Sequence, residues 1–141
     1  MAFTGNYACN AFKTGMMNGT FNLTGGSFYI ALYTNAATLD ATTSAYTATG
    51  EVVAPGYTAG GQLLTITQAP TTGTSGTTAY VSFTNPSWTG ALTARGALIY
   101  QSGGGNPAVC VLDFGSDKAS NTVFTVQFPA VSNTSAIIRI S

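Results

Sequence analysis

The segment that decides the fold is LTARGALIYQSGGGNPAVCVLDF, residues 92–114. Two apolar runs rich in β-branched residues lie on either side of Gly103-Gly104-Gly105-Asn106-Pro107, a composition that favours a turn. Residues 92–100 and 108–114 are therefore expected to pair as an antiparallel β-hairpin. The rest of the chain can then be compared with this hairpin.

Further strand patterns flank the hairpin. They cover residues 27–34, 62–67, 78–83, 123–128 and 136–140. Glu51-Val52-Val53-Ala54 leads into the turn signal Pro55-Gly56. About seven or eight short strands separated by turns predict an all-β fold of two packed antiparallel sheets, either a β-sandwich or a jelly-roll-like barrel. The last strand is expected to leave an edge that another subunit can pair with.

One short helix is expected near the start of the chain, over residues 6–18. Tyr7, Phe12 and Met16 recur there at roughly helical spacing, and Gly15 and Gly19 limit its length. A chain of 141 residues suits a single domain, 1–141, with the helix at 6–18 and the β body at 27–141.

Two polar segments interrupt the strands. Residues 35–50 form a long connection rich in Thr and Ala, and connections of this length are usually functional or mobile. Residues 69–76, Ala-Pro-Thr-Thr-Gly-Thr-Ser-Gly, are expected to form a turn.

The chain is nearly devoid of charge. Charged residues make up 6% of it, against about 25% in an ordinary domain, and it contains no histidine. A Ser-His-Asp triad and a Cys/His zinc site are therefore excluded, and we expect no catalytic residue, metal or cofactor. The four basic residues do not cluster, which argues against nucleic-acid binding.

The sequence shows neither a leader pattern nor an apolar run of the ~20 residues that a membrane helix needs. We therefore expect no membrane partner, and a protein made in the cytosol.

The few acidic and thiol groups allow other interpretations. Asp113 and Asp117 flank Gly115 and resemble the start of a calcium loop, but capping of a turn is favoured. A glycosidase would need two paired carboxylates, and nothing in the sequence pairs two of them across a cleft. Cys9 and Cys110 permit a disulfide, although a buried reduced thiol is favoured for Cys110.

Glu51 and Arg95 each open or lead into a predicted strand. A lone charge in so uncharged a protein is costly to bury without a partner. We therefore predict that one acid pairs with Arg95, and Glu51 is the first choice.

Apolar and aromatic residues supply the candidate contact surface. The candidate interface residues are Phe12, Met16, Tyr46, Tyr57 and Trp88. The N-terminal segment and residues 35–50 are the candidate contact segments. Tyr-rich strands with the Trp88 loop would also suit a carbohydrate-binding module, so this interpretation stays open.

Several of these motifs occur in a characteristic order. They are Ala31-Leu32-Tyr33-Thr34, then Gly50-Glu51-Val52 with Gly56-Tyr57, then Trp88, then Gly96-Ala97-Leu98-Ile99-Tyr100 and the closing β region. In this order the chain resembles a widespread group of small virion structural proteins of tailed bacteriophages. The resemblance extends from about residue 10 to the end, and its motifs are structural and carry no catalytic residue.

The resemblance implies a non-enzymatic virion component made in the host cytoplasm. The leading hypothesis is a capsid decoration (cement) protein that binds the outer surface of the assembled head and stabilises it. Its expected partners are the major capsid protein and neighbouring copies of itself, with a trimer as one arrangement. The alternative within the virion is a tail-associated or fibre-like protein. Low charge predicts neutral interfaces whose binding depends weakly on salt.

Overall fold

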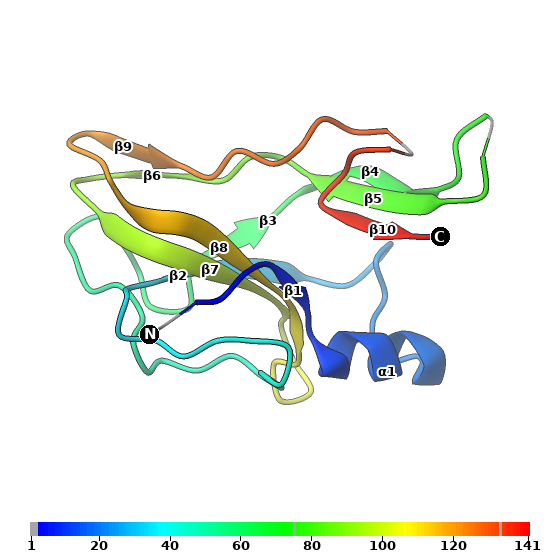
Figure 1. The fold of residues 1–141 in the computed structure, drawn as a ribbon, viewed down its shortest axis with the longest axis horizontal. Coiled ribbons are helices and arrows are strands. Elements are labelled where there is room, and N and C mark those ends of the chain that lie inside the picture. Colours follow the sequence, from blue (N-terminus) through cyan, green and yellow to red (C-terminus); the bar gives the residue numbers. More distant parts are fainter. Residues whose placement is uncertain (1–2, 75, 133) are drawn as a thin grey trace.

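A five-stranded antiparallel sheet organises the fold (Figure 1). In the computed structural model, which describes residues 3–74, 76–132 and 134–141, the strands of this sheet follow the order β1-β8-β7-β2-β3. Their bounds are β1 Tyr7–Ala8, β8 Ala108–Ala119, β7 Thr93–Gln101, β2 Phe28–Tyr33 and β3 Gln62–Leu64. The predicted hairpin of residues 92–114 is confirmed, because β7 and β8 pair as antiparallel neighbours at the centre of the sheet.

Two smaller antiparallel sheets lie along one side of this sheet, and one helix lies at its end (Figure 1). The first has the order β10-β5-β4, with β10 at Ile138–Ile140, β5 at Ala79–Phe83 and β4 at Ile66–Thr71. The second pairs β6, Ser87–Thr89, with β9, Val123–Thr125. Helix α1, Asn10–Asn18, lies at the end of the molecule near β10.

Both faces of the five-stranded sheet are buried, each against a different part of the chain. Phe28, Ile30 and Leu32 of β2 belong to a core shared with α1 and the smaller sheets. Ala31 and Tyr33 alternate with them and belong to a second core, to which Phe3, Cys9, Ala37 and Leu39 also contribute. Strands buried on both faces read as continuous apolar runs, which explains the pattern of residues 28–33.

The polar connection 35–50 covers the second face of the sheet. Tyr46 N–H donates to the carbonyl of Asn106, and Thr34 N–H donates to the carbonyl of Gly50, at 2.9 and 2.8 Å. Ala37 and Leu39 are buried. The apolar residues within this Thr-rich segment therefore fix it on the sheet.

The predicted helix 6–18 begins too early. Helix α1 starts at Asn10, and Tyr7 and Ala8 pair with Val111 and Cys110 as strand β1. Cys9 is extended, with ψ 146°, so it changes the chain from strand to helix. At the other end Gly19 adopts the left-handed conformation, with φ 81°, and ends the helix as predicted.

Several strand bounds also differ from expectation. The single strand expected over residues 62–67 is two strands in different sheets, β3 and β4, and those expected over 123–128 and 136–140 are shortened to β9 and β10. Residues 69–71 extend β4 through Pro70, which is tolerated because β4 is an edge strand. Strand β8 continues through 115–119, beyond the predicted turn, with Gly115 at φ 82°. Residues 51–54 contribute only a bridge between Glu51 and Tyr33.

The all-β class with antiparallel sheets and a short N-terminal helix is confirmed for the described residues. The finer assignment to a sandwich or a jelly-roll-like barrel stays a prediction. No helix within the described residues is long and apolar enough to cross a membrane.

Gly61 provides a test of the fold. It has φ 79°, and a Cβ there would overlap the carbonyl oxygen of Ile30 in β2. We expect Gly61→Ala to lower the free energy of unfolding by more than about 3 kcal/mol, from the clash and the left-handed backbone together. Denaturant unfolding measures this loss.

Gly104→Ala is the matched control. Gly104 has φ 62°, and apart from its two chain neighbours no described residue has a heavy atom within 4 Å of its added Cβ. Only the backbone term of about 1–2 kcal/mol is expected there. Equal losses in the two variants would show that Gly61 does not sit tightly against β2.

Candidate functional site

The most concentrated polar chemistry in the structure surrounds the Glu51 carboxylate. Glu51 is 8% exposed, and its Oε1 accepts hydrogen bonds from the Tyr57 hydroxyl at 2.6 Å and the Gly60 N–H at 2.7 Å. Its Oε2 accepts from the Tyr46 hydroxyl at 2.6 Å. Short hydrogen bonds to a carboxylate are among the strongest neutral–charged contacts in proteins. The arrangement compensates the burial of the charge.

Backbone geometry brings these groups together. The Glu51–Tyr33 bridge holds Glu51 beside β2, and the bond from Val52 N–H to the carbonyl of Leu32 continues the pairing. Pro55-Gly56 then reverses the chain, with Tyr57 N–H donating to the carbonyl of Ala54. The predicted turn therefore returns Tyr57 to the carboxylate that precedes it.

Tyr57 also connects the carboxylate to the central sheet. Its hydroxyl accepts a hydrogen bond from the Leu32 N–H at 2.9 Å while it donates to Glu51. The Tyr100 hydroxyl of β7 donates to the carbonyl of Gly60 at 2.7 Å. One carboxylate thus joins β2, the 57–60 turn and, through Tyr46, the 35–50 connection.

Burial keeps the surrounding hydroxyl groups protonated. Desolvation, with the nearby Glu51 charge, raises the pKa of Tyr33 and of Tyr57 far above the ordinary tyrosine value. The Tyr33 hydroxyl donates to the carbonyl of Thr47 at 2.7 Å. These tyrosines act as fixed hydrogen-bond donors within the fold.

Arg95 pairs with Asp113 rather than with Glu51. Arg95 Nη2 and Nε both lie 3.2 Å from Asp113 Oδ1, and the side chains are 17% and 12% exposed. The expectation that an acid partners Arg95 is confirmed, whereas Glu51 as that partner is wrong. Arg95 lies on β7, and the neighbouring strand β8 carries Asp113. The Glu51 carboxylate instead accepts hydrogen bonds from tyrosine hydroxyls.

Asp113 also binds the backbone two residues after it. Its Oδ1 accepts from the Gly115 N–H at 2.8 Å, a local bond of the capping kind favoured over a calcium loop, although the segment lies within β8 and not at a turn. Asp117 is exposed. Within residues 3–74, 76–132 and 134–141, no three His, Cys, Asp or Glu side chains gather as metal ligands would.

The candidate interface residues occupy different environments. Phe12 and Trp88 are core residues, 5% and 6% exposed, and Trp88 contacts the rings of Tyr57 and Phe124. Tyr46 and Tyr57 are partly buried around Glu51. Met16 lies partly exposed on α1. Trp88 therefore does not offer an exposed platform for a sugar.

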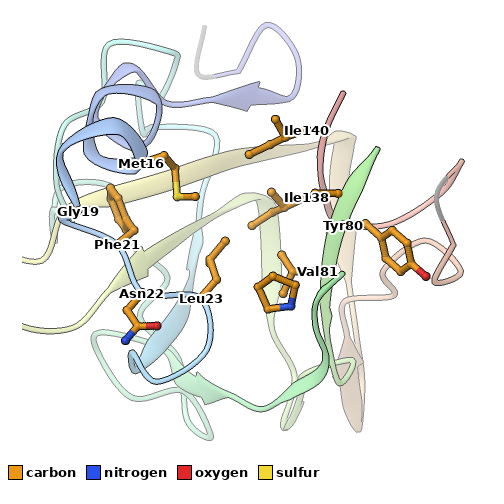
Figure 2. A pocket seen from close by; sticks show the side chains of 11 residues that line it. Met16, Gly19, Phe21, Asn22, Leu23, Tyr80, Val81, Ile138 and Ile140 are labelled. Atoms are coloured by element: carbon orange, nitrogen blue, oxygen red, sulfur yellow. The ribbon is translucent and has the colours of Figure 1, made fainter. Parts of the chain in front are cut away.

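An apolar groove of about 440 Å³ opens between α1 and the β10-β5-β4 sheet (Figure 2). Met16, Phe21 and Leu23 form one wall. Val81, Ile138 and Ile140 face them from the sheet. This groove is the main surface hollow that the predicted N-terminal contact segment helps to form.

Cys9 and Cys110 are free and buried in the structure. They lie on adjacent segments, since Cys9 N–H donates to the carbonyl of Val109, yet they belong to different cores. Burial, with the charge of Asp40, raises the pKa of Cys9 to about 11, so its thiol stays protonated at neutral pH. The buried reduced thiol favoured for Cys110 is confirmed.

Gly60 is the site residue that sequence reasoning missed. Tyr46 and Tyr57 were selected as interface residues, whereas their hydroxyls bind Glu51. The sequence feature that points to this site is Glu51 itself. It precedes the apolar residues Val52 and Val53, and a buried carboxylate there needs hydrogen-bond donors.

Comparisons with protein-family models, with curated proteins and with solved structures find no match to this chain.

Removing one donor tests the Glu51 cluster. We expect Tyr57→Phe to lower the free energy of unfolding by about 2–3 kcal/mol, because it deprives both the buried carboxylate and the Leu32 N–H of a partner. Tyr29→Phe is the control, since the Tyr29 hydroxyl makes none of the hydrogen bonds between described residues. Denaturant unfolding compares them, and equal losses would contradict the structural role of Tyr57.

Alkaline pH tests the raised tyrosine pKa values. The unfolded chain ionises its tyrosines near pH 10.0, whereas Tyr33 and Tyr57 stay protonated in the folded state. Their contribution is complete below that pH and is lost as the pH rises above it, by up to about 1.4 kcal/mol per pH unit per tyrosine.

Unfolding free energies measured from about pH 9 to about pH 11 give the slope. Tyr57→Phe should reduce the slope, because it removes one of the four tyrosines whose pKa is raised, which are Tyr33, Tyr46, Tyr57 and Tyr100. Stability that is constant over this range would overturn the assignment.

Proposed function

We propose that this chain is a non-enzymatic structural protein of a bacteriophage virion, a decoration (cement) protein that binds the outer surface of the assembled head and stabilises it. Its partners are the major capsid protein and neighbouring copies of itself. A tail-associated position is the alternative that the test below separates from this one.

The observation that carries the proposal is that the motif residues make contacts within the chain itself. Glu51 and Tyr57, which belong to the segments that resemble phage virion proteins, and Arg95, which directly precedes the Gly96–Tyr100 segment, are all engaged in contacts within the chain. Trp88 of the same set lies in the core. Such motifs maintain a fold, and this supports a protein whose task is contact rather than chemistry.

The distribution of charge supports the same proposal. The exposed charged residues are Lys13, Asp40, Asp117, Lys118 and Arg139, and Glu51, Arg95 and Asp113 are partly or fully buried. Threonine, serine, asparagine and glycine fill much of the remaining exposed surface. Neutral polar groups exchange water for a partner at a lower desolvation cost than charges do.

Binding to heads tests the proposal. Purified protein is mixed with undecorated heads, and sedimentation with quantitative electrophoresis measures the copies bound per head. We expect saturable binding at a fixed ratio to the capsid protein and a head more resistant to heat. Heads already carrying a full complement are the control, and isolated tails are the competing target. Binding to tails without binding to heads would overturn the decoration role.

Salt dependence separates a neutral contact from an electrostatic one. Because few charges are exposed, the affinity for heads should change by less than about threefold between low and moderate ionic strength. The same titration measures it. A steep fall in affinity with added salt would contradict a neutral interface.

A further inference from the structure

Strand β10 is attached to the fold by a short ladder. Ile138, Arg139 and Ile140 pair with Val81, Tyr80 and Ala79 of β5. The other edge of β10 pairs with no strand of the described residues. Ile138 is buried, whereas Arg139 and Ile140 are exposed. One side chain therefore supplies most of the apolar anchoring of this strand.

Open space borders β10 and the residues before it on several sides. The groove of about 440 Å³ separates Ile138 and Ile140 from α1 (Figure 2). A second groove, of about 200 Å³, lies between residues 137–139 and strands β1 and β8. A third, of about 360 Å³, borders residues 136–137. Surface grooves therefore border β10 and the residues before it on several sides, and Ile138 is the β10 side chain that lies in the core.

The connection into β10 is weakly held. Phe128 N–H donates to Asn85 Oδ1 at 2.8 Å, and among the described residues this is the last hydrogen bond from this part of the chain to the body before β10. Among the described residues of 129–137, the hydrogen bonds join Ser132, Thr134 and Ser135 to one another. The eleven residues from Phe128 to Ile138 are joined by ten Cα–Cα steps and can span up to about 35 Å when extended.

We propose that β10 is exchanged between copies of this chain, so that Ile138–Ile140 of one copy pairs with Ala79–Val81 of a neighbour in the register seen here. The exchanged strand makes the same ladder and buries the same Ile138, so exchange sacrifices none of these contacts. The occupant is a second copy because the strand that fits this edge of β5 is the chain's own.

Exchange also protects a sheet edge. Withdrawing β10 leaves β5 with unpaired backbone groups, and an unpaired edge strand is a template for pairing with other chains. A neighbour's β10 fills that edge and links the two copies. The proposal rests on the proposed function for its biological setting, a head surface with adjacent copies, but its test needs only the purified protein.

Cross-linking between two single variants tests the exchange. Ala79 and Ile140 are register partners, and paired strand positions lie within the range of a disulfide. Chains with Ala79→Cys and chains with Ile140→Cys, distinguished by a size tag, are refolded together and oxidised. We expect a covalent heterodimer as the main cross-linked product on non-reducing electrophoresis, because β5 of each Ala79→Cys chain would receive the partner's β10.

Thr93→Cys mixed with Ala119→Cys is the matched control. These register partners lie on β7 and β8, which one hairpin joins, so no heterodimer is expected from them. The unsubstituted chain controls for Cys9 and Cys110, which are buried. Heterodimer yield no higher than in the Thr93→Cys and Ala119→Cys mixture would overturn the exchange.

The double variant Ala79→Cys/Ile140→Cys gives an independent measurement in one chain. Exchange predicts covalent dimers or larger species, and a strand retained in its own copy predicts a cross-linked monomer. A monomer alone would overturn the proposal. Head binding that persists in such a monomer would then leave the decoration role in place, so the two proposals fail separately.

Discussion

The burial of the Glu51 carboxylate is the constraint on which the rest of the structure depends. A buried charge must be satisfied by hydrogen bonds, and here two tyrosine hydroxyls and one backbone N–H satisfy it. These donors come from two parts of the chain, Tyr46 in the 35–50 connection and Tyr57 and Gly60 in the 57–60 turn, and Tyr57 extends the network to β2. The long connection that covers one face of the central sheet is thereby fixed at its end.

The small number of charged residues shapes both the interior and the surface of the protein. Three of the eight charged side chains are partly or fully buried in the fold, where Glu51 binds tyrosines and Arg95 binds Asp113. The outer surface carries the other five among neutral polar groups, together with an apolar groove beside α1 and the short strand β10. These features favour contact with other chains, and the two proposed partners are the capsid protein and a second copy of this chain.

Local patterns predicted the fold well where one interaction dominates. The Gly103–Pro107 turn between two apolar runs fixed the β7–β8 hairpin, and Pro55-Gly56 fixed the turn before Tyr57. The predictions were wrong where pairing between segments far apart in the sequence determines the local structure. Tyr7 and Ala8 had helical spacing but pair with β8, and Arg95 finds Asp113 only because β7 and β8 are neighbours. The sequence indicates that a buried Glu51 carboxylate needs hydrogen-bond donors. Which hydroxyls donate, those of Tyr46 and Tyr57, is decided by the distances in the folded protein.

Native-state hydrogen exchange at the Gly60 amide tests the central claim most directly, because this N–H donates to the Glu51 carboxylate. If the carboxylate fixes the connection to the sheet, Gly60 should exchange only through global unfolding, with the same free energy of opening as Leu98 and Ile99 in the central strand β7. Exchange of Gly60 through a local opening, while Leu98 and Ile99 remain protected, would contradict the account.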